Sequence, residues 1–180
     1  MQDLSLHILD IAENSLAAGA RRIGIRIEED LTEDRMVIEI VDDGAGMDEE
    51  MARRALDPFV TTRTTRRVGL GLPLLAEACR ACGGELTLQS RPGQGTAVRA
   101  TFQRSHIDRQ PLGNMGDTLI TLIVGHPEVD LCYEHRKGEV SFTLDTAVIK
   151  AELGSASLRS PAVISALRGQ ILSALKELES

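Results

Sequence analysis

Apolar residues are spaced differently in successive segments of the chain. Residues 4–18 carry them at helical spacing and predict an amphipathic helix that ends at Gly19. Residues 22–28 instead alternate, with isoleucine at every second position, as in a strand with one buried face. The same patterns predict strands at 36–41, 85–90 and 96–102, and helices at 48–56 and 72–82.

The order of these elements predicts the fold class. The turn at 91–95 is short and rich in glycine and proline, so its flanking strands are expected to form a hairpin. The order helix, strand, strand, helix, loop, helix, strand, strand indicates an α+β fold, a two-layer sandwich of helices on a mostly antiparallel mixed sheet. Residues 59–68 have no periodicity and are expected to form a mobile loop.

The second part of the chain gives a weaker pattern. Residues 105–116 contain proline and glycine at intervals and are expected to be a linker. Beyond them, residues 117–180 predict a small C-terminal α/β subdomain with an interaction or regulatory role. Its predicted elements are a hairpin of strands at 130–136 and 139–144 and an amphipathic helix at 161–178.

Composition narrows the classes of function. Aromatic residues make up 2% of the chain, the net charge is −7, and no basic run exceeds two residues, so we expect neither nucleic acid nor an anionic membrane as a partner. No segment is apolar for the roughly eighteen residues of a membrane span, and the start lacks a signal-peptide pattern, so we expect a cytoplasmic protein. Cys79 and Cys82 lack a second cysteine pair and are expected to pack in the core rather than bind metal.

Three polar residues share one face of the first predicted helix. His7, Asp10 and Asn14 lie three and four residues apart, so they project in one direction. An asparagine oxygen is a good ligand for Mg2+, which takes its other ligands from water and phosphate. Asp10, one turn earlier, is placed to orient or deprotonate a nucleophile beside a γ-phosphate. Taken alone, an ordinary solvent-facing side of the helix explains the same pattern.

Asp42 follows the apolar strand at 36–41 and precedes two glycines, Gly44 and Gly46. A carboxylate there accepts a hydrogen bond from the exocyclic amine of adenine, whereas guanine presents a carbonyl and would be repelled. The glycines let the backbone approach a flat base and adopt positive φ. The alternative is a simple Asp-Gly turn, which needs no ligand.

A glycine-rich segment at residues 69–72 leads into the predicted helix at 72–82. Backbone amides at such a turn and at a helix N-terminus form an anion site. Arg63, Arg66 and Arg67 lie just upstream, within reach of phosphates or of an acidic partner, although a solvated loop is the simpler explanation. No lysine precedes Lys137, so phosphate in this half would be bound by metal, arginine and backbone amides.

Together these motifs resemble the GHKL superfamily, which contains gyrase, the large heat-shock chaperones, sensor histidine kinases and MutL-type mismatch-repair proteins. Residues 10–20 are similar to its N box, and residues 42–46 and 69–72 to its two glycine boxes. Residues 57–62 resemble the kinase phenylalanine box and residues 93–96 the closing strand. The resemblance covers residues 1 to about 104, with the motifs in the family's order.

The resemblance implies a Bergerat-type ATP-binding domain at 1–104, with ATP and Mg2+ as cofactors and a lid at 59–70. It implies that Asn14 holds the metal and that Asp10, or else Glu13, is the catalytic base. The residues expected at the nucleotide are Asn14, Asp42, Gly44, Gly46, Met47, Arg63, Gly69, Leu70, Gly71, Leu72 and Thr96.

Two positions depart from the family pattern, and both bear on catalysis. Hydrolytic members carry glutamate where Asp10 stands, and kinases carry lysine or arginine where Ala17 stands. We also expect no phosphoacceptor histidine domain before the first helix. We therefore expect an ATP–Mg2+ binding protein that hydrolyses ATP or transfers its phosphoryl group to an unidentified protein partner. The alternative is a non-catalytic ATP sensor whose lid switches partner affinity, and the oligomeric state is left open, with a homodimer as one option.

Overall fold

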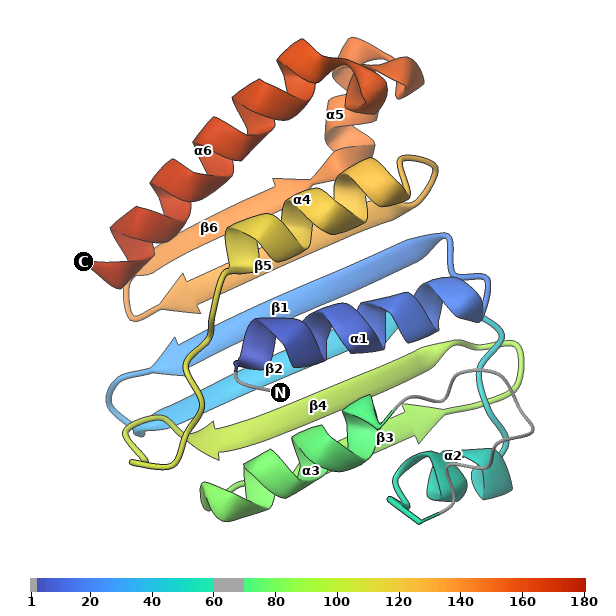
Figure 1. Ribbon diagram of the computed structural model, residues 1–180, viewed down its shortest axis with the longest axis vertical. Coiled ribbons are helices and arrows are strands. Elements are labelled where there is room, and N and C mark those ends of the chain that lie inside the picture. The colour runs from blue at the N-terminus through green and yellow to red at the C-terminus, as the bar shows by residue number, and fades with distance from the viewer. Residues whose placement is uncertain (1–2, 60–69) are drawn as a thin grey trace.

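The computed structural model describes residues 3–59 and 70–180. In chain order the elements are α1 (Leu4–Ala17), β1 (Arg22–Asp30), β2 (Arg35–Asp42), α2 (Glu49–Ala55), α3 (Gly71–Ala81), β3 (Leu86–Ser90), β4 (Thr96–Gln103), α4 (Met115–Gly125), β5 (Asp130–Lys137), β6 (Val140–Asp145), α5 (Thr146–Leu153), a 3-10 turn η1 (Ser155–Arg159) and α6 (Pro161–Glu179). Helices α1, α3 and α4 lie side by side across one face of the sheet (Figure 1).

The strands form one six-stranded sheet in the order β3-β4-β2-β1-β5-β6. Neighbouring strands pair antiparallel except β1 and β5, which run parallel. The predicted α+β sandwich with a mostly antiparallel mixed sheet is therefore confirmed.

The apolar positions of the predicted elements form the core between the sheet and the helices. Leu4 and Ile8 of α1 are fully buried, and Ile23, Ile25 and Ile27 of β1 are buried beneath them. Burying each of these side chains contributes roughly 1.5–3 kcal/mol to folding. Because alternate residues of a strand face opposite sides, Arg22, Arg26 and Glu28 are left on the open face of the sheet, whereas Glu29 shares the face of the isoleucines.

Residues beyond 104 extend the same sheet. β5 lies parallel to β1 with Tyr133 opposite Ile25, and β6 pairs with β5 at the edge. The predicted hairpin and the predicted final helix are both present, the latter as α6. The boundaries of the predicted domain, linker and subdomain stay predictions, and the strands on either side of them share one hydrogen-bonded sheet.

Two helices in this part of the chain were not predicted. α4 begins at Met115, so the last two residues of the expected linker are helical, and α5 follows directly after β6. Most residues of α4 are buried, and its exposed residues, Asp117, Thr121, Val124 and Gly125, lie on one stripe at helical spacing. Two of these four are not polar, so hydropathy alone marks the stripe only weakly.

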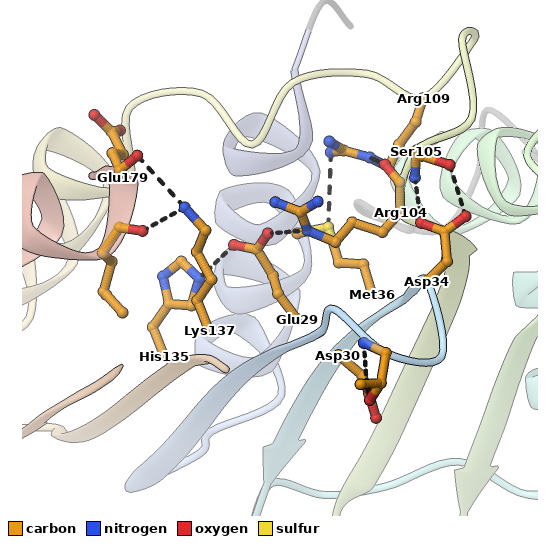
Figure 2. A network of polar contacts seen from close by, with 12 residues as sticks. Glu29, Asp30, Asp34, Met36, Arg104, Ser105, Arg109, His135, Lys137 and Glu179 are labelled. Atoms are coloured by element: carbon orange, nitrogen blue, oxygen red, sulfur yellow. Dashed lines mark hydrogen bonds and ion pairs between the residues drawn. The ribbon is translucent and has the colours of Figure 1, made fainter. Parts of the chain in front are cut away.

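A partly buried ionic network fastens β5 and α6 to β1 (Figure 2). His135 of β5 donates to Glu29 over 3.0 Å, and Arg104 donates to the other oxygen over 2.8 Å. Burial raises the pKa of Glu29, but these hydrogen bonds outweigh it and lower the pKa to about 2. Lys137 extends the network to α6, where it donates to the carbonyl oxygen of Leu178 over 2.7 Å. These contacts thus tie together four segments that are distant in the sequence: β1, the residues after β4, β5 and α6.

The two neighbouring cysteines pack as expected. Cys79 and Cys82 are buried, and burial raises the pKa of the Cys79 thiol to about 12. Across residues 3–59 and 70–180, no group of three or more His, Cys, Asp or Glu side chains is placed to hold a metal ion. Within the same residues, no helix has both the length and the apolar character needed to cross a membrane.

Candidate functional site

The polar side of α1 faces a hollow of about 960 Å³. Asp10, Glu13 and Asn14 line it, together with residues at the end of α1 and in the turn after α4. Asp10 and Asn14 are half-buried and lie one turn apart, whereas Glu13 is exposed. The structure therefore brings together the two acids predicted as candidate bases and the predicted metal ligand.

His7 does not share the exposure of that polar side. It is buried because residues before α4 fold back over the start of α1, where Leu4 and Ser5 donate backbone hydrogen bonds to Pro111 and Leu112. Nε2 of His7 lies 3.1 Å from a side-chain oxygen in this same segment, that of Gln110. Burial lowers the pKa of His7, so the imidazole is neutral at pH 7.

Asp10 lies against the first turn of α3. A Cβ atom added to Gly71, the first residue of that helix, would overlap Asp10 Oδ2. Glycine at this position therefore lets the amide-bearing end of α3 come close to the carboxylate on α1. The close approach gives the second glycine box a definite role, which is to bring the two helices together beside the hollow.

Asp42 stands at the end of β2 and is held by two hydrogen bonds. Ser15 Oγ on α1 donates to Oδ2 over 2.5 Å, and the Gly44 amide donates to Oδ1 over 2.9 Å. A carboxylate offers about four lone-pair directions, so each oxygen keeps one for a further donor. Ser15 was not singled out from the sequence. The sequence feature that could have indicated Ser15 is its place as a polar residue on the apolar stripe of the helix, four positions after Ile11.

The glycines after Asp42 contact protein backbone rather than open space. Gly46 has φ +69°, as expected, and an added Cβ would overlap the carbonyl oxygen of Arg91. Gly44 does not have positive φ, and its tight neighbours are Ala18 and Asp42 itself. The space for a Cβ at these glycines is thus taken up by the 91–95 turn and the end of α1, and their approach to a flat base stays a prediction.

Thr96 lies directly opposite Asp42, in the register of β2 and β4. Its hydroxyl is 2.9 Å from Ser90 Oγ, which also accepts from the Met47 amide over 2.8 Å and donates to the Gly95 carbonyl over 2.9 Å. Because Ser90 has one proton, the Thr96 hydroxyl donates to it and keeps its own lone pairs free. Ser90 is a second site residue that the sequence pattern did not single out. A hollow of about 860 Å³ beside β2, β3 and β4 is bordered by Asp42, Met47, Ser90, Gly95 and Thr96.

The residues expected from the lid are only partly described. Arg63 and Gly69 lie outside the described residues. Leu70 is exposed just before α3, while Leu72 is 5% exposed and packs in the core. Since its side chain faces inward, Leu72 offers a ligand only its backbone.

Residues 2–106 match the family model for histidine kinase-, DNA gyrase B- and HSP90-like ATPases, which is more than half of the chain. The chain belongs to this ATPase family. The resemblance to the GHKL superfamily is thereby confirmed.

Relatives of this ATPase-family chain include a nitrogen regulation protein and a sensor kinase. The nitrogen regulation protein NtrY of Azorhizobium caulinodans is 33% identical over 88 residues, which cover 48% of this chain and 11% of NtrY. The sensor protein kinase FleS of Pseudomonas aeruginosa is 36% identical over 91 residues, which cover 51% of this chain and 22% of FleS. The matched region is thus less than a quarter of each relative's length.

A solved member of the MutL group shares the fold. The Aquifex aeolicus MutL ATPase domain, in its complex with ADP, superimposes with a TM-score of 0.53 at 14% identity. The superposition covers 86% of this chain and 68% of that one, so it reaches beyond residue 106 of this ATPase-family chain into its C-terminal strands and helices.

Proposed function

We propose that this chain binds ATP with Mg2+ between α1, the end of β2 and the start of α3. The observation that carries the proposal is the paired fixing of Asp42 by Ser15 and Gly44, which leaves acceptor positions on a carboxylate whose orientation is set. Family membership supports the same nucleotide.

The adenine end of the proposed site is built from Asp42 and Thr96. The free lone pairs of the carboxylate accept from the exocyclic amine of adenine, and the Thr96 oxygen adds a second acceptor beside it. A site of this kind discriminates against guanine, because a carbonyl in place of the amine would leave two acceptors facing each other.

The phosphate end lies along the polar side of α1. Asn14 is half-buried at the hollow and offers one neutral oxygen, which suits a Mg2+ ion that takes its remaining ligands from water and phosphates. When bound, the ion would neutralise charge on the phosphates. Backbone amides at the start of α3 add hydrogen-bond donors there.

Asp10 is the base in this proposal. Its carboxylate is held beside the start of α3 by the close packing of Gly71, one turn from Asn14. It orients and deprotonates the attacking group, which is water in hydrolysis or a side chain in phosphoryl transfer to a protein partner. Glu13 is exposed and turned toward His126, with 3.9 Å between Glu13 Oε2 and Nε2 of the imidazole, so it is less well placed.

A non-catalytic ATP sensor is the second candidate. Two features favour it. The acid at position 10 is one methylene shorter than the glutamate of the hydrolytic relatives, and exposed Ala17 replaces the cation of the kinases. In a sensor, ATP would order the lid and change the affinity for a partner without turnover.

Calorimetry with ATP and Mg2+ tests the binding proposal. Asp42→Asn replaces one acceptor oxygen by an amide donor and should weaken binding at least about tenfold. Asp43→Asn is the matched control, because the neighbouring acid accepts from the Arg21 and Arg22 amides through Oδ1, an acceptor that asparagine keeps. Equal affinity in wild type and Asp42→Asn would overturn the adenine assignment.

Release of labelled phosphate separates the enzyme from the sensor. Asp10→Asn should abolish turnover and keep ATP affinity if Asp10 is the base. Turnover that is unchanged in this variant would remove Asp10 from the mechanism. A wild type that binds ATP and never releases or transfers phosphate would favour the sensor.

A further inference from the structure

Three side chains form a row across neighbouring strands at the proposed adenine end. Ser90 of β3 stands opposite Thr96 of β4, and Thr96 stands opposite Asp42 of β2. Residues directly opposite each other on paired strands project to the same face of the sheet. Because Asp42 accepts from Ser15 on α1, this face is the one that carries the helices. Ser90 is thus connected to the proposed adenine-binding carboxylate through Thr96, and all three residues line the same hollow.

The hydroxyl of Ser90 uses its full hydrogen-bonding capacity within the protein. It donates its proton to the Gly95 carbonyl over 2.9 Å and accepts from the Met47 amide over 2.8 Å. Its oxygen also lies 2.9 Å from Thr96 Oγ1. A hydroxyl has one proton and two lone pairs, so the contact with Thr96 takes the second lone pair and Thr96 is the donor. The proton of Thr96 is therefore directed away from the hollow.

The two backbone groups that orient this hydroxyl belong to closely packed segments. A Cβ atom added to Gly95 would overlap the backbone carbonyl of Asp42. A Cβ atom added to Gly46, directly before Met47, would overlap a backbone carbonyl of the turn that contains Gly95. The Met47 amide and the Gly95 carbonyl therefore have little room to move relative to Asp42. A hydroxyl held between two such groups is preorganised before any nucleotide binds.

We propose that Ser90 is a positioning residue for base specificity, which holds the Thr96 proton and so makes Thr96 solely an acceptor toward the base. The inference rests on the proposed function, because it needs adenine beside Asp42 and Thr96. Two acceptors then face the exocyclic amine of adenine, and they oppose the carbonyl that hypoxanthine and guanine carry in its place. Without the Ser90 oxygen, the Thr96 proton is free to turn toward that carbonyl, and the discrimination weakens.

Competition binding on the full chain tests this role. The probe is a fluorescent ATP analogue, and the competitors are ATP and inosine triphosphate, each with Mg2+. Inosine triphosphate carries a carbonyl where ATP carries the exocyclic amine. Ser90→Ala should raise the affinity for inosine triphosphate about fivefold and lower that for ATP by no more than about threefold, so the ratio of affinities falls about tenfold. A purely structural loss would lower both affinities together.

Further variants show whether Ser90 acts through Thr96. Ser90→Thr keeps the hydroxyl and should keep the wild-type ratio, while Thr87→Ala removes a hydroxyl from the exposed opposite face of the same strand and should change neither affinity. In a Thr96→Val background, Ser90→Ala should no longer change the ratio. Ser90→Cys offers only a weak acceptor and should shift the ratio in the same direction as alanine. It replaces Ser90→Ala if thermal unfolding shows that the alanine variant is not folded.

The possible outcomes separate this inference from the proposed function. An unchanged ratio in Ser90→Ala, equal losses of both affinities, or a ratio that still falls in the Thr96→Val background overturns the positioning role and leaves ATP binding in place. A wild type that binds ATP and inosine triphosphate equally well does not read the exocyclic amine, and the inference is overturned with the adenine assignment. If calorimetry shows that wild type does not bind ATP, the proposed function fails and this inference fails with it.

Discussion

The hydroxyl of Ser15 donates a hydrogen bond of 2.5 Å to Asp42 Oδ2, which joins the middle of α1 to the end of β2. The bond links the N box to the first glycine box through side chains 27 residues apart. It also restricts the rotation of the Asp42 carboxylate. In our account this orientation is what prepares the carboxylate for adenine.

Ser15→Ala should therefore weaken both folding and ATP binding. A hydrogen bond to a charged group contributes about 1.5–3 kcal/mol, and water will replace part of it at this half-buried carboxylate. We expect about 1–2 kcal/mol less free energy of unfolding in urea, and ATP affinity reduced about fivefold to tenfold in calorimetry. Ser5→Ala is the control, because Ser5 donates to Asp3 on the same helix, far from Asp42. Loss of affinity in both variants would show that the effect is not specific to Asp42.

The contact between Gly71 and Asp10 predicts a coupling between the two positions. Gly71→Ala places a Cβ on Asp10 Oδ2 and should lower the free energy of unfolding by about 1 kcal/mol. In an Asp10→Ala background the same change should cost nothing, because alanine is favoured in a helix. A urea-denaturation double-mutant cycle measures the difference, and additive effects would mean that the two residues do not touch.

Gly46 and Gly93 form a natural pair for separating strain from overlap. Both have positive φ, +69° and +74°, but only Gly46 has a backbone carbonyl where its Cβ would stand. Gly93→Ala should cost about 1 kcal/mol of unfolding free energy for backbone strain alone. Gly46→Ala should cost roughly 3 kcal/mol or more, because the turn carrying Arg91 must also shift. Equal melting temperatures for the two variants would contradict the close packing of these turns.

Local patterns were enough to predict most of the first hundred residues. The strands there have one open face, so their side chains alternate, and α1 has one polar side, so its apolar residues keep a helical period. α4 was missed because its exposed stripe includes Val124 and Gly125 beside Asp117 and Thr121, so hydropathy marks that stripe only weakly. The parallel pairing of β5 with β1 joins residues more than a hundred positions apart, and no local pattern encodes it.

The residues of the candidate site likewise fall into those that local sequence patterns predicted and those that they did not. Asp10, Asn14, Asp42 and Thr96 were predicted because each belongs to a motif with fixed spacing. Ser15 and Ser90 were not, since their role depends on which side chains the fold brings next to them. His7 was assigned to the exposed side of its helix, because the sequence did not reveal that the segment before α4 would cover it.

The lowered pKa of Glu29 predicts how the free energy of unfolding changes with pH. Its pKa is about 2 in the folded chain against a usual value of 4.5, so it favours folding at all pH values above 4.5. That contribution, about 3 kcal/mol, should be lost as the pH falls from 4.5 toward 2. In chemical denaturation, the stability gap between wild type and Glu29→Gln should shrink over this range. Glu28→Gln, on the more exposed neighbouring residue, should show no such convergence. A constant gap for Glu29→Gln would contradict the role of the network.

Calorimetry of the wild-type chain with ATP and with GTP, each with Mg2+, tests the central claim most directly. Our account predicts measurable heat for ATP and an affinity for GTP at least about a hundredfold lower, because Asp42 and the guanine carbonyl are both acceptors. Equal affinities for the two nucleotides, or no heat with millimolar ATP, would contradict it.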